Sequence, residues 1–386
     1  MGITTKRQGT FWTTQQQELL LRAALLNGRE AIDAWSEWKS CVDIDDIDLL
    51  DPGSYRLLPL VYRNLNNQRV EDPLMMKLKG IYRLTWYKNQ MLFHTIANLL
   101  RSFHKAGIET MVLKGAALTF FCYKDYGLRP MNDFDVLIHT GQALQAVHLL
   151  KELGWQPRNF EPSEDYISVS YSHGFVDNSN RELDLHWHLL SQNRNEGADD
   201  AFWEGAVLTK VHDIPVYLLN TTDQLLHICV HGAKWNDIPS FRWVADAFMV
   251  MKNALSEIDW NRLITQAKKR RLILPLKDTL NYLRDSFDAP IASKFLQSIK
   301  DIPVSKIDRI EYKITVSPPS RWTAVLDLWC QHSRLMGNAN VMRKFIRFPR
   351  FLQDIWRLSI WKLPFYGVFK VITWSKNRLA GVASHK

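Results

Sequence analysis

The chain has 386 residues, of which 46% are hydrophobic and 23% charged, proportions that are typical of a globular protein and argue against disorder. The four cysteines, Cys41, Cys122, Cys229 and Cys330, are far apart in the sequence, so neither a C-x-x-C zinc site nor a disulfide framework is indicated. Of the net charge of +9, +8 falls in residues 341–378, which leaves +1 for the rest. We therefore expect no broad nucleic-acid-binding surface on the body of the protein.

The first hundred residues have a helical pattern. Apolar residues recur at three- and four-residue spacing over residues 14–105, interrupted by a turn at 51–55. We assign residues 1–106 to an N-terminal helical region. The first residues, 1–21, lack the apolar core of a signal peptide, which predicts a cytoplasmic protein.

The pattern changes at Gly107, after which short apolar segments alternate with helical ones. In chain order we expect a strand at 108–113, a helix at 116–127, a strand at 132–139, a helix at 141–154 and two hairpin strands at 165–177 and 181–189. This order predicts an α+β fold, with a small mixed sheet that has helices on one face. We place this core at residues 107–190.

The remaining residues are predicted to be helical again. Residues 223–283 show helical spacing, and we assign 191–316 to a C-terminal helical region. Residues 317–320 read as a linker, and 317–386 form a basic, aromatic tail.

Two carboxylates lie two residues apart on the second predicted strand. Side chains two apart on a strand share a face and are separated by about 6.6–6.8 Å along the chain. Asp133 and Asp135 therefore project together, while Phe134 and Val136 turn to the core. Paired carboxylates on a rigid strand suit Mg²⁺, which binds through oxygen ligands and substrate phosphates.

Residues 182–189 alternate without a break between polar and apolar side chains. One face holds Glu182, Asp184, His186 and His188, and the other is apolar. If this strand lies beside that of Asp133, Asp184 completes a cluster of three carboxylates. Such a cluster repels itself unless cations neutralise it, and two Mg²⁺ ions would do so.

Lys114-Gly115 stands where the first predicted strand gives way to a helix. Glycine there allows the backbone to approach a phosphate, the free N–H groups at the helix start favour an anion, and Lys114 adds a positive charge. Arg129, four residues before Asp133, is a further candidate for neutralising a triphosphate.

These segments together resemble a known family. LKGAAL, the run from Tyr126 to Ile138 and the segment Glu182–Trp187 are similar to an uncharacterised bacterial nucleotidyltransferase family of the DNA polymerase β-like superfamily. The resemblance covers roughly residues 15–285. It implies a glycine turn before the first helix, an acid-x-acid strand and a third acid on a later strand.

The residues that match this pattern are Gly115, Asp133, Asp135 and Asp184, and the resemblance implies roles for Arg129 and His186 without specifying them. Lys114-Gly115-Ala116 departs from the superfamily, which usually has a serine or a second glycine here.

We therefore expect Mg²⁺-dependent (or Mn²⁺-dependent) transfer of a nucleoside monophosphate from an NTP to a hydroxyl-type acceptor, which is a small molecule, a peptide or a protein. Asp133, Asp135 and Asp184 would bind metal, and Lys114, Gly115 and Arg129 would bind the nucleotide. Two alternatives stay open: a metal-dependent glycosyltransferase with a D-x-D site, and a non-catalytic module that binds a nucleotide or a partner.

Arg242 and Asp246 are four residues apart in the C-terminal helical region. They could pair on one helix face, or contact the base or the acceptor, so Arg242 is a possible accessory residue along with His186.

The tail mixes aromatic residues with clustered positive charge. Residues 341–378 hold one acid, Asp354, and nine basic residues, Arg343, Lys344, Arg347, Arg350, Arg357, Lys362, Lys370, Lys376 and Arg378. This composition fits a helix on an anionic membrane, on an acidic partner or on the body itself. The protein could thus attach peripherally to a membrane.

Overall fold

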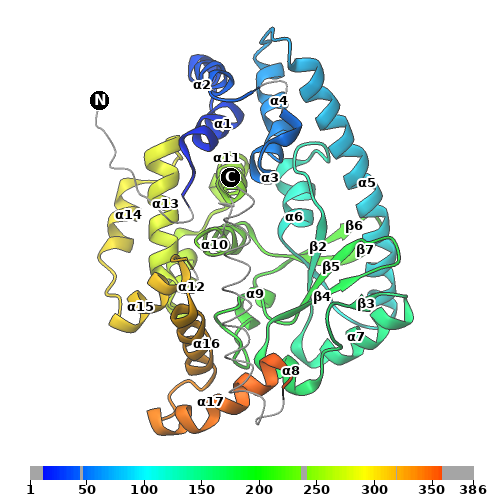
Figure 1. Ribbon diagram of the computed structural model, residues 1–386, viewed down its shortest axis with the longest axis vertical. Helices are drawn as coiled ribbons and strands as arrows, with labels where there is room; N and C mark the ends of the chain where they lie inside the picture. Colours follow the sequence, from blue (N-terminus) through cyan, green and yellow to red (C-terminus); the bar gives the residue numbers. More distant parts are fainter. Residues whose placement is uncertain (1–11, 44–46, 236–240, 319, 359–386) are drawn as a thin grey trace.

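A computed structural model describes residues 12–43, 47–235, 241–318 and 320–358 (Figure 1). Helices precede the sheet, as predicted: α1 (Gln15–Leu25), α2 (Gly28–Ser40), α3 (Pro52–Tyr55), α4 (Leu58–Asn67) and the long α5 (Met75–Lys105), with a 3₁₀ turn at Ile47–Leu49. Thr14 begins α1 with a capping box, in which its side chain accepts from the Gln17 amide and the Gln17 side chain accepts from the Thr14 amide.

Within the described residues, seven strands form one mixed sheet in the order β3-β4-β5-β2-β1-β7-β6. The strands are β1 (Met111–Val112), β2 (Asp133–Leu137), β3 (Gln156–Pro157), β4 (Ser172–Val176), β5 (Glu182–His186), β6 (Val207–Val211) and β7 (Ile214–Leu218). β2 pairs in parallel with β5 and antiparallel with β1, and β1 pairs in parallel with β7. The α+β fold expected from the sequence is confirmed.

One face of the sheet packs on helices α5 and α7 (Ala143–Glu152). The apolar side chains of β2 and β5, among them Phe134, Val136, Leu183 and Leu185, form a core with these helices. Figure 1 shows α5 running along the outer side of the sheet. Because side chains alternate along a strand, the polar side chains of β2 and β5 must occupy the opposite face.

The structure corrects three expectations about secondary structure. Residues 165–177 are not one strand, because Ser163 caps a short helix, α8 (Glu164–Val169), before β4 begins. The helix expected at 116–127 is a single α turn, α6 (Lys114–Ala117), followed by a π-helix at Leu118–Tyr123. β6 and β7 lie in the stretch assigned to the C-terminal helical region, so the sheet extends beyond residue 190.

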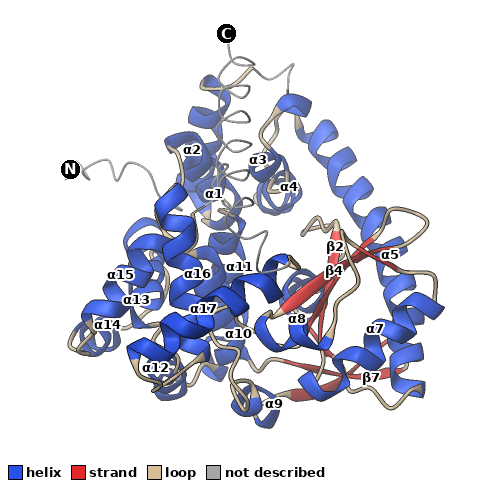
Figure 2. Cartoon of the chain, turned by 60° about the horizontal axis from the view of Figure 1, so that its bottom comes forward, coloured by secondary structure: helices blue, strands red, loops and turns tan. Residues whose placement is uncertain are grey.

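A short helix, α9 (Asp200–Glu204), precedes β6. The helices after β7 gather on the other side of the molecule from β7 (Figure 2). They are α10 (Thr221–Gly232), α11 (Arg242–Ala254), α12 (Trp260–Lys269), α13 (Ile273–Phe287), α14 (Ser293–Lys300), α15 (Lys306–Thr315), α16 (Arg321–Leu335) and α17 (Val341–Trp356); short 3₁₀ turns occur at Thr140–Gln142 and Leu255–Glu257.

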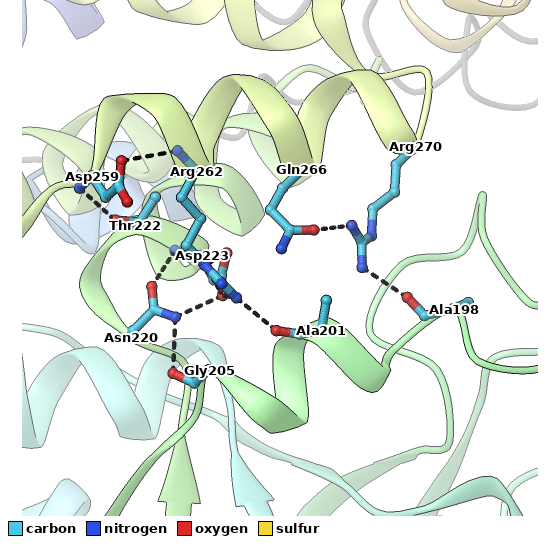
Figure 3. Close-up of polar contacts among 10 residues, drawn as sticks. All are labelled: Ala198, Ala201, Gly205, Asn220, Thr222, Asp223, Asp259, Arg262, Gln266 and Arg270. Carbon is cyan, nitrogen blue, oxygen red and sulfur yellow. Dashed lines mark hydrogen bonds and ion pairs between the residues drawn. The ribbon is translucent and has the colours of Figure 1, made fainter.

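A buried polar network ties α10 and α12 to the loop around α9 (Figure 3). The Arg262 guanidinium donates to both carboxylate oxygens of Asp223 and to the carbonyl of Ala201. Arg270 donates to the carbonyl of Ala198. These hydrogen bonds join α10 and α12 to α9 and to the residues just before it.

The basic tail is helical in the part that the structure describes. α17 packs on α16 and α8, and its Phe351 is buried. Lys362, Lys370, Lys376 and Arg378 lie outside the described residues. Among the described helices, none is both long enough and apolar enough to cross a bilayer.

Candidate active site

The two acidic strands lie side by side. β2 and β5 run parallel in a register that pairs Asp133 with Glu182 and Asp135 with Asp184. Leu183 and Leu185 are fully buried on the other face of β5. The carboxylates of Asp135 and Asp184 therefore occupy neighbouring positions on the same face of the sheet.

His186 joins this pair from the end of β5. Ligand atoms of Asp135, Asp184 and His186 all lie within 4.8 Å of one another. His186 Nε2 donates to Asp135 Oδ1 at 3.0 Å, and Lys114 Nζ donates to the same oxygen at 2.5 Å. Burial alone would raise the pKa of Asp135, but the charges and hydrogen bonds of Lys114 and His186 outweigh it and hold that pKa well below its usual value.

Asp184 has the opposite electrostatic environment. Its pKa is raised, first by burial and then by the negative charge of Asp135, with a smaller contribution from Asp133. Asp133 is half-buried at the start of β2 and also lines the cleft described below. Two adjacent carboxylates thus have pKa values shifted in opposite directions.

His188, which continues the polar pattern in the sequence, lies beyond the end of β5 and outside this cluster. Its Nδ1 is 2.7 Å from Asp199 Oδ2, and Asp199 also accepts from the amide of Leu189. His188 therefore holds the chain after β5 in place.

The Lys114-Gly115 turn begins α6 directly beside the acids. Lys114 has a left-handed backbone, with φ of +43°, which is uncommon for a residue other than glycine. A Cβ atom at Gly115 would collide with Arg129 Nη1 and crowd the Met131 side chain. The position therefore requires glycine, because any side chain would displace Arg129.

Arg129 and Asp246 form a buried ion pair that joins the sheet to α11. Arg129 Nε and Nη2 each donate to a different oxygen of Asp246 at 2.8 Å, and Tyr123 Oη donates to Asp246 at 2.9 Å. The expected pairing of Asp246 with Arg242 is replaced by this contact, which spans 117 residues of sequence. Arg242 instead donates from Nη1 to the carbonyl of Pro130 at 2.8 Å.

A cleft of about 670 Å³, open to solvent, lies between the acidic face of the sheet and helices α10 and α11. Its lining includes the expected residues Lys114, Gly115, Arg129, Asp133, Asp135, Arg242 and Asp246, joined by Gln224, His227 and His231 of α10. The structure thus brings together residues that the sequence places more than 100 positions apart.

Gln224 and His227 were not foreseen from the sequence. Gln224, His227 and His231 are spaced three and four residues apart on α10, so they share one face of an otherwise apolar helix, and this spacing is the signal that could have identified them. Burial, followed by the charge of Lys114, lowers the pKa of His227 to about 3, so its imidazole is neutral at physiological pH.

The acidic face has the chemistry of a divalent-cation site. Asp135 and Asp184 supply carboxylate oxygens, the ligands that Mg²⁺ and Mn²⁺ prefer, and His186 lies beside them. Within the described residues, the buried His186 Nδ1 has no hydrogen-bond partner and the buried amide nitrogen of Gln224 has no acceptor, which is unusual unless a ligand completes the site. The two carboxylates fit a metal ion, and the Gln224 amide fits an acceptor atom of a polar ligand.

Comparisons with known proteins identify a family for the chain. A search of curated proteins gives no match. Among solved structures, the chain is similar to the antibiotic-resistance factor ANT(2'')-Ia, determined in solution in a study of its substrate-regulated conformational dynamics, at a TM-score of 0.34 and 9% identity over 50% of this chain and 99% of that one. The family described as uncharacterised nucleotidyltransferase matches residues 54–288. That match spans more than half of the chain and includes both acidic strands and α10, so the chain belongs to this family of nucleotidyltransferases.

Proposed function

We propose that the protein transfers a nucleoside monophosphate from an NTP to a hydroxyl of an acceptor, with Mg²⁺ or Mn²⁺ as cofactor. The observation that carries this proposal is the in-register pairing of Asp135 and Asp184 on parallel strands, beside Lys114 and at the edge of a cleft. Family membership supports the reaction class, and the arrangement of these side chains supports the metal and the residue roles.

Asp133, Asp135 and Asp184 would hold the metal, with His186 as a neighbouring donor. When bound, a divalent cation polarises the phosphoryl oxygens and neutralises the charge that develops during displacement at phosphorus. Three acids also repel one another in a partly buried site, so a bound cation would relieve an electrostatic cost that the apo protein carries.

Lys114 would exchange its partner during the reaction. Its ammonium now neutralises Asp135, and it lies beside a glycine turn where a phosphate can approach the backbone. A triphosphate entering the cleft offers the ammonium a second anion. Arg129 would act mainly by position, since its Nε and Nη2 donate to Asp246 and its Nη1 lies against Gly115.

Asp184 is the group placed to receive a proton. Burial and the neighbouring Asp135 charge raise its pKa, which makes it a stronger base than an ordinary aspartate. In the transfer, the acceptor oxygen forms a bond to the α-phosphorus, and the bond from that phosphorus to the bridging oxygen breaks. Pyrophosphate leaves with the electron pair, and the hydroxyl proton passes to Asp184.

Helix α10 forms one wall of the cleft in which the acceptor would bind. Gln224 presents a buried amide without a partner among the described residues, and His227 is neutral, so both can exchange hydrogen bonds with a polar ligand. Arg242 lies at the same wall. A glycosyltransferase would require neither Asp184 nor the Lys114-Gly115 turn, and the family match favours nucleotidyl transfer over that alternative.

The test uses NTPs labelled separately at the α- and γ-phosphates, incubated with Mg²⁺, the full chain and fractionated cell extract as the source of acceptor. We expect the α-label to enter a product while the γ-label leaves as pyrophosphate. Asp135→Asn should lower the rate on the order of 10³-fold or more, since it removes a carboxylate that would hold the metal ion. Asp213→Asn, an exposed acid at the β6–β7 turn, is the matched control and should leave the rate unchanged.

Transfer of the γ-label to a product would contradict nucleotidyl transfer and indicate phosphoryl transfer. Equal rates for wild type and Asp135→Asn would contradict the assignment of the site. Incorporation of sugar from a labelled nucleotide sugar, with no α-label incorporated, would favour the glycosyltransferase.

A further inference from the structure

Helix α17 has an exposed apolar strip near its start. Val341, Met342, Phe345 and Ile346 are 60–72% exposed. Their spacing of one, three and four residues places them side by side over the first turns of the helix. An exposed cluster of this kind marks a surface that meets another apolar phase.

The neighbouring side of α17 is already occupied by contacts with α16. Phe348 and Phe351 pack against His332, with ring centroids 5.5 and 5.0 Å apart, and the ring of Phe345 lies 4.5 Å from that of Trp329. His332 Nε2 also lies 3.0 Å from the carbonyl oxygen of Lys344, and Arg357 binds the carbonyl of Glu161. The helix is thus anchored to the body on one side, so the exposed strip is held in a fixed direction.

A basic strip runs beside the exposed apolar one. Arg343, Arg347 and Arg350 are four and three residues apart, are exposed, and form no ion pair with any described residue. Nearly all the net charge of the chain falls in residues 341–378. The helix therefore presents apolar side chains and uncompensated positive charge to the same exterior.

We propose that α17 docks on an anionic lipid surface, with Val341, Met342, Phe345 and Ile346 inserted at the headgroup boundary and Arg343, Arg347 and Arg350 among the phosphates. A helix in the plane of the interface requires an apolar strip and basic flanks of this kind. A nucleic-acid backbone would match the arginines but leave four aliphatic or aromatic side chains in water. The inference is independent of the chemistry proposed for the cleft.

Cosedimentation of the full chain with vesicles tests the proposal. The vesicles are phosphatidylcholine alone or with about one-third phosphatidylglycerol, at low and high salt. We expect binding to the anionic vesicles at low salt and release at high salt. Replacing the three arginines together by glutamine should weaken binding about 100-fold, because each basic residue near an anionic surface contributes about a factor of five or more.

Two control variants carry the same chemical changes at other exposed positions. Lys268→Gln/Lys269→Gln/Lys300→Gln removes three charges from α12 and α14, and Ile307→Ser/Ile310→Ser removes two exposed apolar side chains from α15. Both should bind vesicles like wild type. Met342→Ser/Ile346→Ser should weaken binding at least tenfold, while far-UV circular dichroism and the thermal midpoint remain unchanged, because these two side chains are 69% and 72% exposed.

Failure of the full chain to bind anionic vesicles at low salt would overturn the proposal. Equal losses in the α17 variants and their controls would overturn it as well, since binding would then reflect total charge. Binding that depends on the arginines but not on Met342 and Ile346 would overturn insertion, and would instead favour an acidic macromolecule that contacts charge alone.

Discussion

The acidic face of the sheet and the network around Asp223 are two ways of placing carboxylates inside one chain. Asp223 is fully buried, and each of its oxygens accepts from Arg262; one also accepts from Asn220 Nδ2 at 2.7 Å (Figure 3). Arg262 and Asn220 in turn donate to the backbone carbonyls of Ala201 and Gly205. The two charges of the Asp223–Arg262 pair are each other's counterpart, as expected where burial serves folding.

The acidic face is left incomplete. Lys114 and His186 both donate to one oxygen of Asp135, while Asp184 stands beside that carboxylate with a raised pKa. His186 Nδ1 is buried with no partner among the described residues. The comparison teaches that a fully paired carboxylate such as Asp223 joins helices of the fold. The incompletely paired groups of the acidic face lie where we propose that the ligand binds.

Asp246 combines features of the acidic face and of the Asp223 network. It lines the cleft, and its carboxylate is fully paired with Arg129. Asp246→Asn should lower the free energy of unfolding by about 3–5 kcal/mol, since it leaves the Arg129 charge buried without its counter-ion. Chemical denaturation of wild type and variant measures this. A loss below about 1 kcal/mol would place Asp246 with the ligand-binding groups instead.

The difference in the free energy of unfolding between wild type and Asp246→Asn should also depend on pH. Burial alone would raise the pKa of Asp246, but the charge and hydrogen bonds of Arg129 lower it overall. A carboxyl group whose pKa is depressed in the folded state contributes stability above its unfolded pKa, near 4, and loses that contribution as the pH falls through its folded value. The difference in the free energy of unfolding between wild type and Asp246→Asn should therefore become smaller at acidic pH.

Asp223 belongs to the buried network and does not line the cleft, so its substitution should change stability alone. Asp223→Asn should lower the free energy of unfolding by about 2–3 kcal/mol, a smaller loss because Arg262 is partly exposed and can turn to water. Transfer per folded molecule should be unchanged. Asp259→Asn is the matched control: Asp259 caps the same helix, α12, and asparagine caps a helix about as well, so its cost should be near zero.

The acidic face could be predicted from the sequence because the period of a strand fixes which side chains share a face. Asp133 with Asp135 and Asp184 with His186 required only this alternation. Alternation does not say which strands are neighbours. The parallel pairing of β2 with β5 depends on the hairpin and helices between them, and the Arg129–Asp246 pair depends on the packing of α11.

β6 and β7 were missed for local reasons. Their turn has no glycine, and His212 adopts the left-handed conformation at φ of +55° in its place. Pro215 lies inside β7, and proline in a candidate strand argues against that assignment. α8 was missed because its few residues are rich in β-branched side chains, and its packing against α17 outweighs that preference.

Asp184→Asn should give the smallest change in the free energy of unfolding, but the sign of that change is the most informative. A ligand-binding carboxylate predicts a gain in stability on substitution, and a carboxylate that serves the fold predicts a loss. The pKa of Asp184 is raised by burial and by the charge of Asp135, so its ionised form is less stable in the folded protein than in the unfolded one. A group with a raised carboxyl pKa costs stability as the pH rises through its unfolded value, and that cost is present at neutral pH. Asp184→Asn should therefore raise the free energy of unfolding of the metal-free protein at pH 7, by about 1 kcal/mol or less, while nucleotidyl transfer is lost. In acid, where Asp184 is protonated, wild type and variant should have equal stability. A variant that is less stable than wild type at pH 7 would mean that Asp184, like Asp223, is held by partners that serve the fold.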